Sequence, residues 1–368
     1  MRISGIDHVE YYVDDLAKSA ATLCEAFGFE VAGRQAAGAG PSGQQSLLLA
    51  QGQIRLLLTT ATSASHPAAH YVKRHGDGVA VIAFKTDDVR RTFAETVAAG
   101  ATPIASPEFA GTGDAVVGTA AVSGFGDVLH KLVQRADPAG EFAPGAIEMT
   151  PARGSRGGDD TELFEALDHV AVCLQPGELD STVQYYRDVF GLAQIYDERI
   201  EVGNQAMLSK VVQDEAASVT FTLIEPDLSR EPGQIDEFLT AHDGAGVQHL
   251  AFRTADIALA VRTVSGRGVE FLVAPAGYYQ TLRARLGMLA IPIPVLRELN
   301  VLADRDRWGQ MFQIFARSTH PRHTFFLELI ERKGALTFGS RNIKALYEAL
   351  EDEHADHDSE LTTLTSDR

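Results

Sequence analysis

The stretch GAGVQHLAFRTADI, residues 244–257, has a counterpart earlier in the chain, GDGVAVIAFKTDDV, residues 76–89. Aligned without a gap, the two stretches are identical at seven of fourteen positions, and three further positions keep their side-chain character. One change does alter the chemistry, because His249 stands where the earlier copy has Val81. Internal similarity of this kind predicts a duplicated structural unit. The second copy therefore carries a histidine that its twin lacks.

Two further pairs of segments repeat in the same order. Residues 6–30 match residues 167–193, each an apolar strand with a histidine followed by a helix that ends near Phe-Gly, and residues 127–135 match residues 325–332. Short strands alternating with helices predict an α+β fold, here built twice. The second copy is longer by about thirty residues, around positions 278–301.

Changes in composition mark the boundaries of the two copies. A segment rich in Pro, Gly and Ala separates them, which is typical of a linker. The last residues are acidic and nearly without large apolar groups, which is typical of disorder. We expect a non-catalytic N-terminal domain over 1–136, a linker over 137–160, a C-terminal catalytic domain over 161–350 and a tail over 351–368.

The overall composition restricts the possible partners. With 368 residues, 45% of them hydrophobic, the chain can bury a large core. A net charge of −18 would repel nucleic acid and anionic membranes, so we expect neither as a partner. The two cysteines, Cys24 and Cys173, are too few for a disulfide framework, and the N-terminus lacks the apolar run of a signal peptide. These features favour a cytoplasmic protein.

Polar residues on the repeat-matched strands predict a metal site in the second copy. The candidate ligands are His169, His249 and Glu328. Two imidazoles and one carboxylate form the facial triad of non-haem Fe(II) enzymes, which leaves coordination positions open for substrate and O₂. The matched positions of the first copy hold His8, Val81 and Lys131. Because valine offers no donor atom and the ammonium of lysine repels a cation, we expect only the second copy to bind metal.

A purely structural interpretation competes with this one, because a single histidine on a strand is more often a hydrogen-bonded core residue than a ligand. Glu328 argues for the metal, since its carboxylate lies among apolar residues, where an unpaired charge is costly. Other histidines are not expected to be ligands: His320 and His323 lie in a predicted turn, and His354 and His357 lie in the acidic tail.

Four segments carry a family resemblance: GAGVQHLAFRT (244–254), FQIF (312–315), FFLELIER (325–332) and TFGSRNIKALYEALE (337–351). Together they resemble the 4-hydroxyphenylpyruvate dioxygenase family, which includes the 4-hydroxymandelate synthases and belongs to the vicinal oxygen chelate superfamily. The resemblance covers about residues 6–350. It implies two tandem vicinal oxygen chelate (glyoxalase/dioxygenase-like) domains, each a duplicated βαβββ open barrel, with Fe(II) bound only in the C-terminal barrel. The iron ligands of the family fall on the same three residues that the repeat identifies.

The resemblance also implies the reaction. Enzymes of this family decarboxylate 4-hydroxyphenylpyruvate with O₂ and incorporate both oxygen atoms. One branch oxidises the ring and forms homogentisate in tyrosine catabolism; the other hydroxylates the benzylic carbon and forms 4-hydroxymandelate, which supplies hydroxyphenylglycine for peptide antibiotics. Here Ile343 stands where the ring-oxidising branch has phenylalanine, and Ile224 stands where it has asparagine. Both departures favour the benzylic product, with homogentisate as the alternative product and a metal-free small-ligand binding protein as the alternative class.

The same resemblance assigns substrate contacts to five residues: Ser209, Thr222, Gln313, Phe338 and Ile343. A few convergent polar groups in an apolar pocket orient a small ligand, and the C-terminal helix is expected to act as a lid that excludes water. Gln248 either supports the neighbouring histidine or, by strand alternation, points to the opposite face. From the family we also expect a homo-oligomer, with a dimer favoured.

Overall fold

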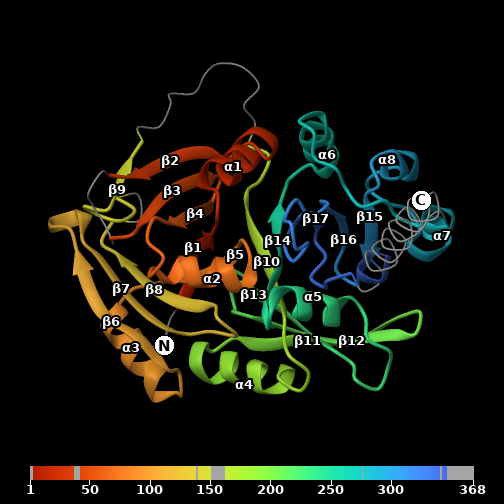
Figure 1. Ribbon diagram of the computed structural model, residues 1–368. Coiled ribbons are helices and arrows are strands. Elements are labelled where there is room, and N and C mark those ends of the chain that lie inside the picture. Colours follow the sequence, from red (N-terminus) through yellow and green to blue (C-terminus); the bar gives the residue numbers. More distant parts are fainter. Residues whose placement is uncertain are drawn as a thin grey trace, which may run out of the picture.

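Each half of the chain forms one strongly curved, mixed β-sheet with helices packed against it (Figure 1). The computed structural model describes residues 3–36, 42–137, 140–150, 162–275, 277–339 and 342–345. The two sheets lie side by side, with the N-terminal module on the left of the view and the C-terminal module on the right. The predicted α+β fold, built twice, is therefore confirmed.

The N-terminal module contains two βαβββ units, the first from β1 to β4 and the second from β5 to β8. Its elements are β1 (Ile3–Tyr12), α1 (Leu16–Ala21), β2 (Glu30–Gln35), β3 (Gln44–Gln51), β4 (Ile54–Ala61), α2 (Pro67–His75), β5 (Gly78–Thr86), α3 (Val89–Ala98), β6 (Pro103–Ala110), β7 (Val117–Ser123), β8 (Leu129–Arg135) and β9 (Ile147–Met149). The strands follow the order β6-β7-β8-β5-β1-β4-β3-β2-β9 across the sheet.

The C-terminal module repeats this arrangement. Its elements are β10 (Ala166–Cys173), α4 (Leu179–Phe190), β11 (Ala193–Val202), β12 (Gln205–Gln213), β13 (Thr220–Pro226), α5 (Gln234–His242), β14 (Gly246–Arg253), α6 (Ile257–Gly266), α7 (Tyr278–Leu286), α8 (Ile293–Glu298), β15 (Leu302–Arg305), β16 (Gln310–Phe315) and β17 (Phe326–Lys333). The order β11-β12-β13-β10-β14-β17-β16-β15 matches the first sheet read from β2 back to β6, strand for strand, and β9 has no counterpart among the described strands of the second sheet. The extra residues of the second copy form α7 and α8.

The register of the central strands is the same in both modules. In the first, His8 pairs with an alanine of β5, and that alanine pairs with Lys131 of β8. In the second, His169 pairs with an alanine of β14, and that alanine pairs with Glu328 of β17. The equivalences inferred from the sequence repeat therefore hold residue by residue in the sheets.

Matching local signals start matching helices. Asp88 and Asp256 are the N-cap residues of α3 and α6, and each side chain accepts a hydrogen bond from the backbone amide three residues on. The β3–β4 hairpin turns at Gly52, whose φ of +54° favours glycine. A Cβ there would also lie 2.4 Å from the carbonyl oxygen of Phe164, so this glycine lets the first hairpin meet the second module.

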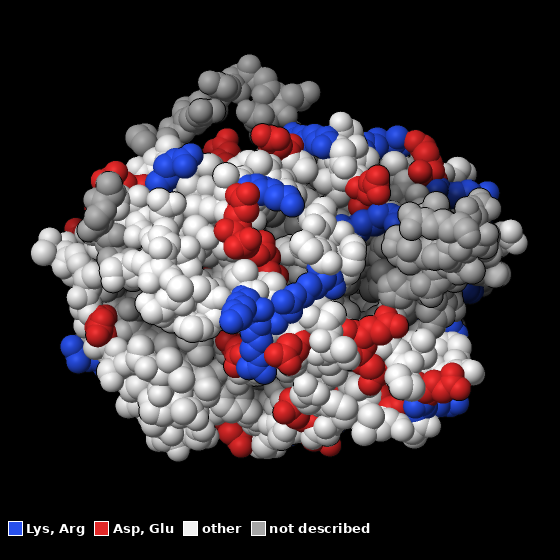
Figure 2. Space-filling view, viewed as in Figure 1, with Lys and Arg blue, Asp and Glu red and all other residues white. Residues whose placement is uncertain are grey.

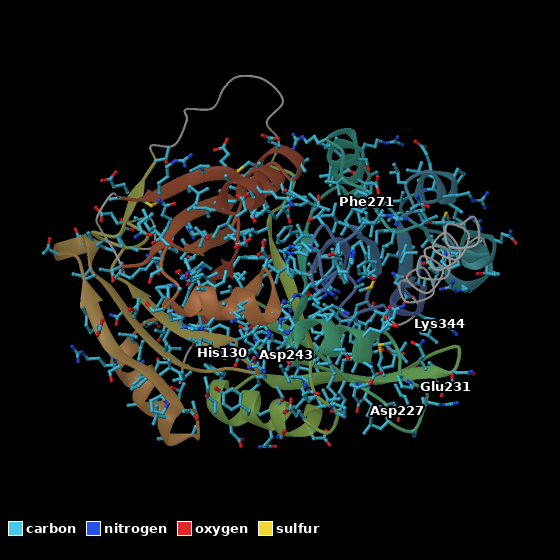
Figure 3. All side chains as sticks on the ribbon, viewed as in Figure 1. His130, Asp227, Glu231, Asp243, Phe271 and Lys344 are labelled. Carbon is cyan, nitrogen blue, oxygen red and sulfur yellow. The ribbon has the colours of Figure 1, made fainter. Side chains whose placement is uncertain are left out.

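The two modules share one hydrophobic core. Phe84 of β5 packs against Phe221 of β13, with ring centroids 6.2 Å apart. His130 of β8 is fully buried and its Nε2 lies 2.8 Å from the hydroxyl of Tyr186 on α4. Figure 3 labels His130 and Asp243, which lie near the centre of the molecule where the modules meet. This packing fixes the position of the C-terminal sheet relative to the N-terminal one.

The expected linker contributes to the first sheet. Its described part includes β9, which pairs with β2 in an antiparallel arrangement. Residues 138–139 and 151–161, and the whole of the predicted tail, 351–368, lie outside the described residues. Segment 137–160 therefore adds an edge strand as well as connecting the modules.

Charged side chains of both signs are interspersed on the face shown in Figure 2, where basic groups lie next to acidic ones. Both cysteines are free, as expected for a chain without a disulfide framework. Within the described ranges, no helix is long and apolar enough to span a membrane.

Candidate metal centre

Three potential metal ligands converge on the inner face of the C-terminal sheet. His169 projects from β10, His249 from β14 and Glu328 from β17, and their ligand atoms all lie within 4.8 Å of one another. The Oε2 atom of Glu328 lies 3.4 Å from Nε2 of His169 and 3.2 Å from Nε2 of His249. All three side chains are buried. Three adjacent strands thus bring together residues that are up to 159 positions apart, from 169 to 328.

Neighbouring side chains orient both imidazoles. Nδ1 of His169 donates a hydrogen bond to Asp168 Oδ1 at 2.9 Å, and Nδ1 of His249 donates to Gln248 Oε1 at 3.3 Å. With Nδ1 occupied, the lone pair of each Nε2 can point toward the cluster, which is the usual arrangement for a metal-bound histidine. Gln248 therefore contacts its neighbouring histidine, although alternation along the strand directs its Cβ to the opposite face.

Electrostatics within the cluster are dominated by Glu328. Burial alone would raise its pKa, but the two imidazoles lower the pKa to about 2, so the carboxylate is ionised. Burial alone would lower the pKa of His169, but the charge of Glu328 and the hydrogen bond to Asp168 raise it to about 9. Burial lowers the pKa of His249 despite its contact with the same carboxylate. The two histidines thus shift in opposite directions, because His169 has a second carboxylate at Nδ1.

The donor set fits a divalent transition metal. Imidazole nitrogen and carboxylate oxygen bind such ions at about 2.0–2.2 Å, so ligand atoms of one site lie a few ångströms apart, as they do here. Once both imidazoles bind the ion as neutral donors, only the carboxylate is charged, so a bound divalent ion would keep a net positive charge toward an anionic substrate. Two histidines and one carboxylate on one side leave the other positions open, which is typical of Fe(II) oxygenases.

Residues proposed to contact substrate lie on the same inner face. Thr222 of β13 pairs with Ala171, and Ser209 of β12 pairs with Ile224, so strand alternation turns these side chains to the side that carries His169. Ser209 and Thr222 are each 4% exposed. The hydroxyl of Thr222 is buried and has no hydrogen-bond partner among the described residues. Such a hydroxyl is available to a polar group of a ligand.

Gln313 lies beside the metal ligands. Its Nε2 donates to Glu328 Oε1 at 2.8 Å, and its Oε1 accepts from Asn342 Nδ2 at 2.8 Å. The side chain is 2% exposed. Gln313 thus holds the carboxylate of the candidate ligand Glu328, a contact that the sequence did not predict. The second hydrogen of its Nε2 amide is not used in these two bonds.

Residues 338–339 and 342–345, near the C-terminus, cover this face. The Phe338 ring lies edge-on to the His169 ring, with centroids 5.5 Å apart, and precedes the described helical residues 342–345. Ile343 packs against an apolar cluster that includes Met207 and Ile224. The remainder of the predicted lid helix, 346–350, lies outside the described residues.

Several other histidines lie apart from the cluster. His8, the counterpart of His169, bonds Asp7 through Nδ1, while its buried Nε2 has no partner among the residues the structure describes. His320 packs against Phe325, and His323 adopts a turn conformation with φ of +54°. Neither of the last two belongs to the group that could hold a metal ion.

Comparisons with known proteins agree with this geometry. Residues 5–120 and 166–314 match the glyoxalase/bleomycin resistance protein/dioxygenase superfamily. The chain is 30% identical to 4-hydroxyphenylpyruvate dioxygenase of Yarrowia lipolytica, covering 95% of this chain and 92% of the relative. It is also 30% identical to the enzyme of the same name from Dictyostelium discoideum, covering 95% and 98% of the two chains.

A solved structure is closer in sequence than either of these relatives. It is a triple mutant of 4-hydroxymandelate synthase from Streptomyces coelicolor, 44% identical to this chain, with a TM-score of 0.87. The match covers 96% of this chain and 100% of that one.

Proposed function

This chain belongs to the glyoxalase/bleomycin resistance protein/dioxygenase superfamily and, within it, to the 4-hydroxyphenylpyruvate dioxygenase family; from this premise we propose that it is a 4-hydroxymandelate-forming non-haem iron dioxygenase. The reaction converts 4-hydroxyphenylpyruvate and O₂ into 4-hydroxymandelate and CO₂. One oxygen atom enters the new carboxylate and the other becomes the benzylic hydroxyl. The observation that carries the proposal is the buried His169, His249 and Glu328 cluster.

Fe(II) held by these three residues supplies the activation of O₂ and of the 2-oxo acid. The chain itself contributes position and environment. Gln313 holds the Glu328 carboxylate through its amide, and the unpartnered hydroxyl of Thr222 is available to a polar group of the substrate. Phe338, 4% exposed, covers the His169 side of the cluster and excludes water from it.

The benzylic product is supported by the shape of the inner face. Ile224 and Ile343 belong to one apolar cluster, at the positions where the ring-oxidising branch is expected to carry asparagine and phenylalanine. With no flat ring at 343 and no amide at 224, the aromatic ring of the substrate would have room to shift, which would bring its benzylic carbon nearer the proposed metal site. A misplacement of about 1 Å can change a rate about 100-fold, so a displacement of that size would be sufficient to select the product.

Incubation of the purified protein with Fe(II), ascorbate, O₂ and 4-hydroxyphenylpyruvate, followed by chromatography and mass analysis, tests the proposal. We expect 4-hydroxymandelate, and we expect none from the Glu328→Gln variant, whose amide cannot replace an anionic ligand. Homogentisate as the main product would assign the chain to the ring-oxidising branch. If anaerobic titration with Fe(II) and substrate produced no charge-transfer band, the chain would instead be a metal-free binding protein.

A further inference from the structure

A closed ring of contacts joins a candidate metal ligand to the aromatic residue that covers it. Nδ1 of His169 donates to Asp168, and Asp168 accepts two hydrogen bonds from Arg332, from Nε and Nη2, both 2.8 Å. Nη1 of Arg332 donates to the carbonyl oxygen of Thr337 at 2.7 Å. The next residue is Phe338, whose ring stacks on the guanidinium at 5.0 Å and meets the His169 ring edge-on. His169, Asp168, Arg332 and Phe338 are thus each held by two neighbours in this closed set of contacts.

The ring is built from buried, charge-assisted bonds. The side chains of Asp168 and Arg332 are 6% and 16% exposed. A forked arginine–carboxylate pair of this kind fixes orientation as well as distance. Asp306 holds the same backbone from the other side, because its carboxylate accepts from the amides of Leu336 and Thr337. The segment before Phe338 therefore has its carbonyl groups bound by Arg332 and its amides bound by Asp306.

The N-terminal module contains the same ring without the metal ligands. His8 bonds Asp7 at 2.7 Å, and Arg135 donates to both Asp7 oxygens, at 2.9 and 2.8 Å. Arg135 also donates to the carbonyl of Phe142, and the Phe142 ring lies edge-on to His8 with centroids 4.8 Å apart. Because this module has Val81 at the position of the second histidine, the ring does not depend on a metal ion for its formation.

We propose that Asp168 and Arg332 are positioning residues, which hold His169 and Phe338 as one unit in the metal-binding geometry before any metal is bound. Asp168 fixes the imidazole orientation, and Arg332 ties that orientation to the backbone over the site. The proposal rests on the metal site of the proposed function and extends it to two residues that touch neither metal nor substrate. Partners of metal-bound histidines typically change metal affinity about 10- to 100-fold when they are removed.

A matched pair of variants tests the idea, because the chain offers the same arginine twice. Arg332→Gln breaks the ring beside the metal site, and Arg135→Gln breaks its twin. The first measurement is the Fe(II) dissociation constant of the full-length protein, by anaerobic competition with a fluorescent chelator and without substrate. We expect Arg332→Gln to weaken binding about 10- to 100-fold, Arg332→Lys to restore part of the loss, and Arg135→Gln to bind like the wild type.

Amide hydrogen exchange of residues 335–339 in the metal-free protein is the second measurement. We expect faster exchange in Arg332→Gln only. If Arg332→Gln fails to fold, Asp168→Asn, which keeps the shape of the side chain, takes its place with the same expected results. Wild-type affinity and wild-type exchange in the folded variant would overturn the inference, as would equal weakening by Arg135→Gln. Failure of the wild type itself to bind Fe(II) would instead overturn the proposed function.

Discussion

Replacing Asn342 with leucine is expected to destabilise the C-terminal module, because this fully buried amide links the metal ligands to the C-terminal helical residues. Its Nδ2 donates to Gln313 Oε1 at 2.8 Å, and its Oδ1 accepts from the Tyr278 hydroxyl at 2.7 Å. Gln313 in turn donates to Glu328. The chain of bonds therefore runs from α7 through residue 342 to the candidate metal centre.

The size of the destabilisation depends on which hydrogen bonds Tyr278 and Gln313 keep in the variant. Two hydrogen bonds are lost, each contributing a net of about 1 kcal/mol. The Tyr278 hydroxyl has one proton, which Asn342 Oδ1 and the Ala303 carbonyl share; in the variant it donates to that carbonyl, at 2.9 Å, and still accepts from the Ala303 amide, at 2.8 Å, so it remains satisfied. The Oε1 atom of Gln313, 2% exposed as a residue, loses its donor, which costs about 1–3 kcal/mol. Since the apolar leucine recovers part of this, we expect a loss of about 2–4 kcal/mol in the free energy of unfolding.

Equilibrium urea unfolding of the metal-free protein measures this loss. The single tryptophan, Trp308, lies in the turn between β15 and β16 and reports on the C-terminal module by fluorescence. Asn204→Leu, the same chemical change at an exposed position, is the control and should alter stability by no more than about 0.5 kcal/mol. If Asn342→Leu unfolded at the wild-type urea concentration, the bond chain would contribute nothing and the reasoning would be refuted.

Three further predictions concern product specificity, the pH dependence of stability and metal binding by the N-terminal module. Ile343→Phe should crowd the substrate pose that gives the benzylic product by about 1–3 kcal/mol, which would shift the product ratio toward homogentisate about 5- to 150-fold. The control Ile343→Leu should still form 4-hydroxymandelate. Product chromatography measures the ratio, and 4-hydroxymandelate alone at an undiminished rate from Ile343→Phe would contradict this account of the pocket. Burial and the neighbouring histidine lower the pKa of His242 to about 4, so the unfolded chain takes up the proton first. The stability conferred by neutral His242 is present above about pH 6.5 and is lost as the pH falls toward 4, by up to about 1.4 kcal/mol per pH unit. Urea unfolding at pH 6 and pH 5 should show a smaller loss of unfolding free energy in His242→Gln than in the wild type. The same loss in both proteins would contradict this prediction. Combining Glu10→Ala, Val81→His and Lys131→Glu should raise the number of Fe(II) ions bound per chain from one to two in a metal titration, and a folded variant that still bound one would count against the equivalence of the modules.

Much of the candidate site could be predicted because the repeat fixes strand register. A strand alternates its side chains with period two, so matching one residue between the copies matches every inward position. His249 could be identified against Val81, and Glu328 against Lys131, without any knowledge of the fold. The order of strands in the two sheets confirms that the copies are equivalent.

Contacts between residues far apart in the sequence could not be predicted in the same way. Asp168 and Arg332 are 164 positions apart, and no periodicity within one strand relates them. A signal did exist, because both copies have an acidic residue before the histidine and an arginine near the end of the last strand. Gln313 was expected to contact substrate, and its bond to Glu328 depends on the pairing of β16 with β17. The sequence contains no separate signal for that pairing.

The N-terminal module shows why a second histidine alone would not create a metal site there. Glu10, 5% exposed, accepts from the Thr59 hydroxyl at 2.7 Å and lies 3.7 Å from the ammonium of Lys131, so these inner-face groups satisfy one another. In the C-terminal module the position of Glu10 is Ala171, and that of Lys131 is Glu328. The exchange removes an internal ion pair and leaves a carboxylate whose favourable partner is a cation, since a buried charge without one is costly. The two modules therefore differ by a coupled set of substitutions, and a metal ion bound at the proposed site would play in the C-terminal module the electrostatic part that Lys131 plays in its twin.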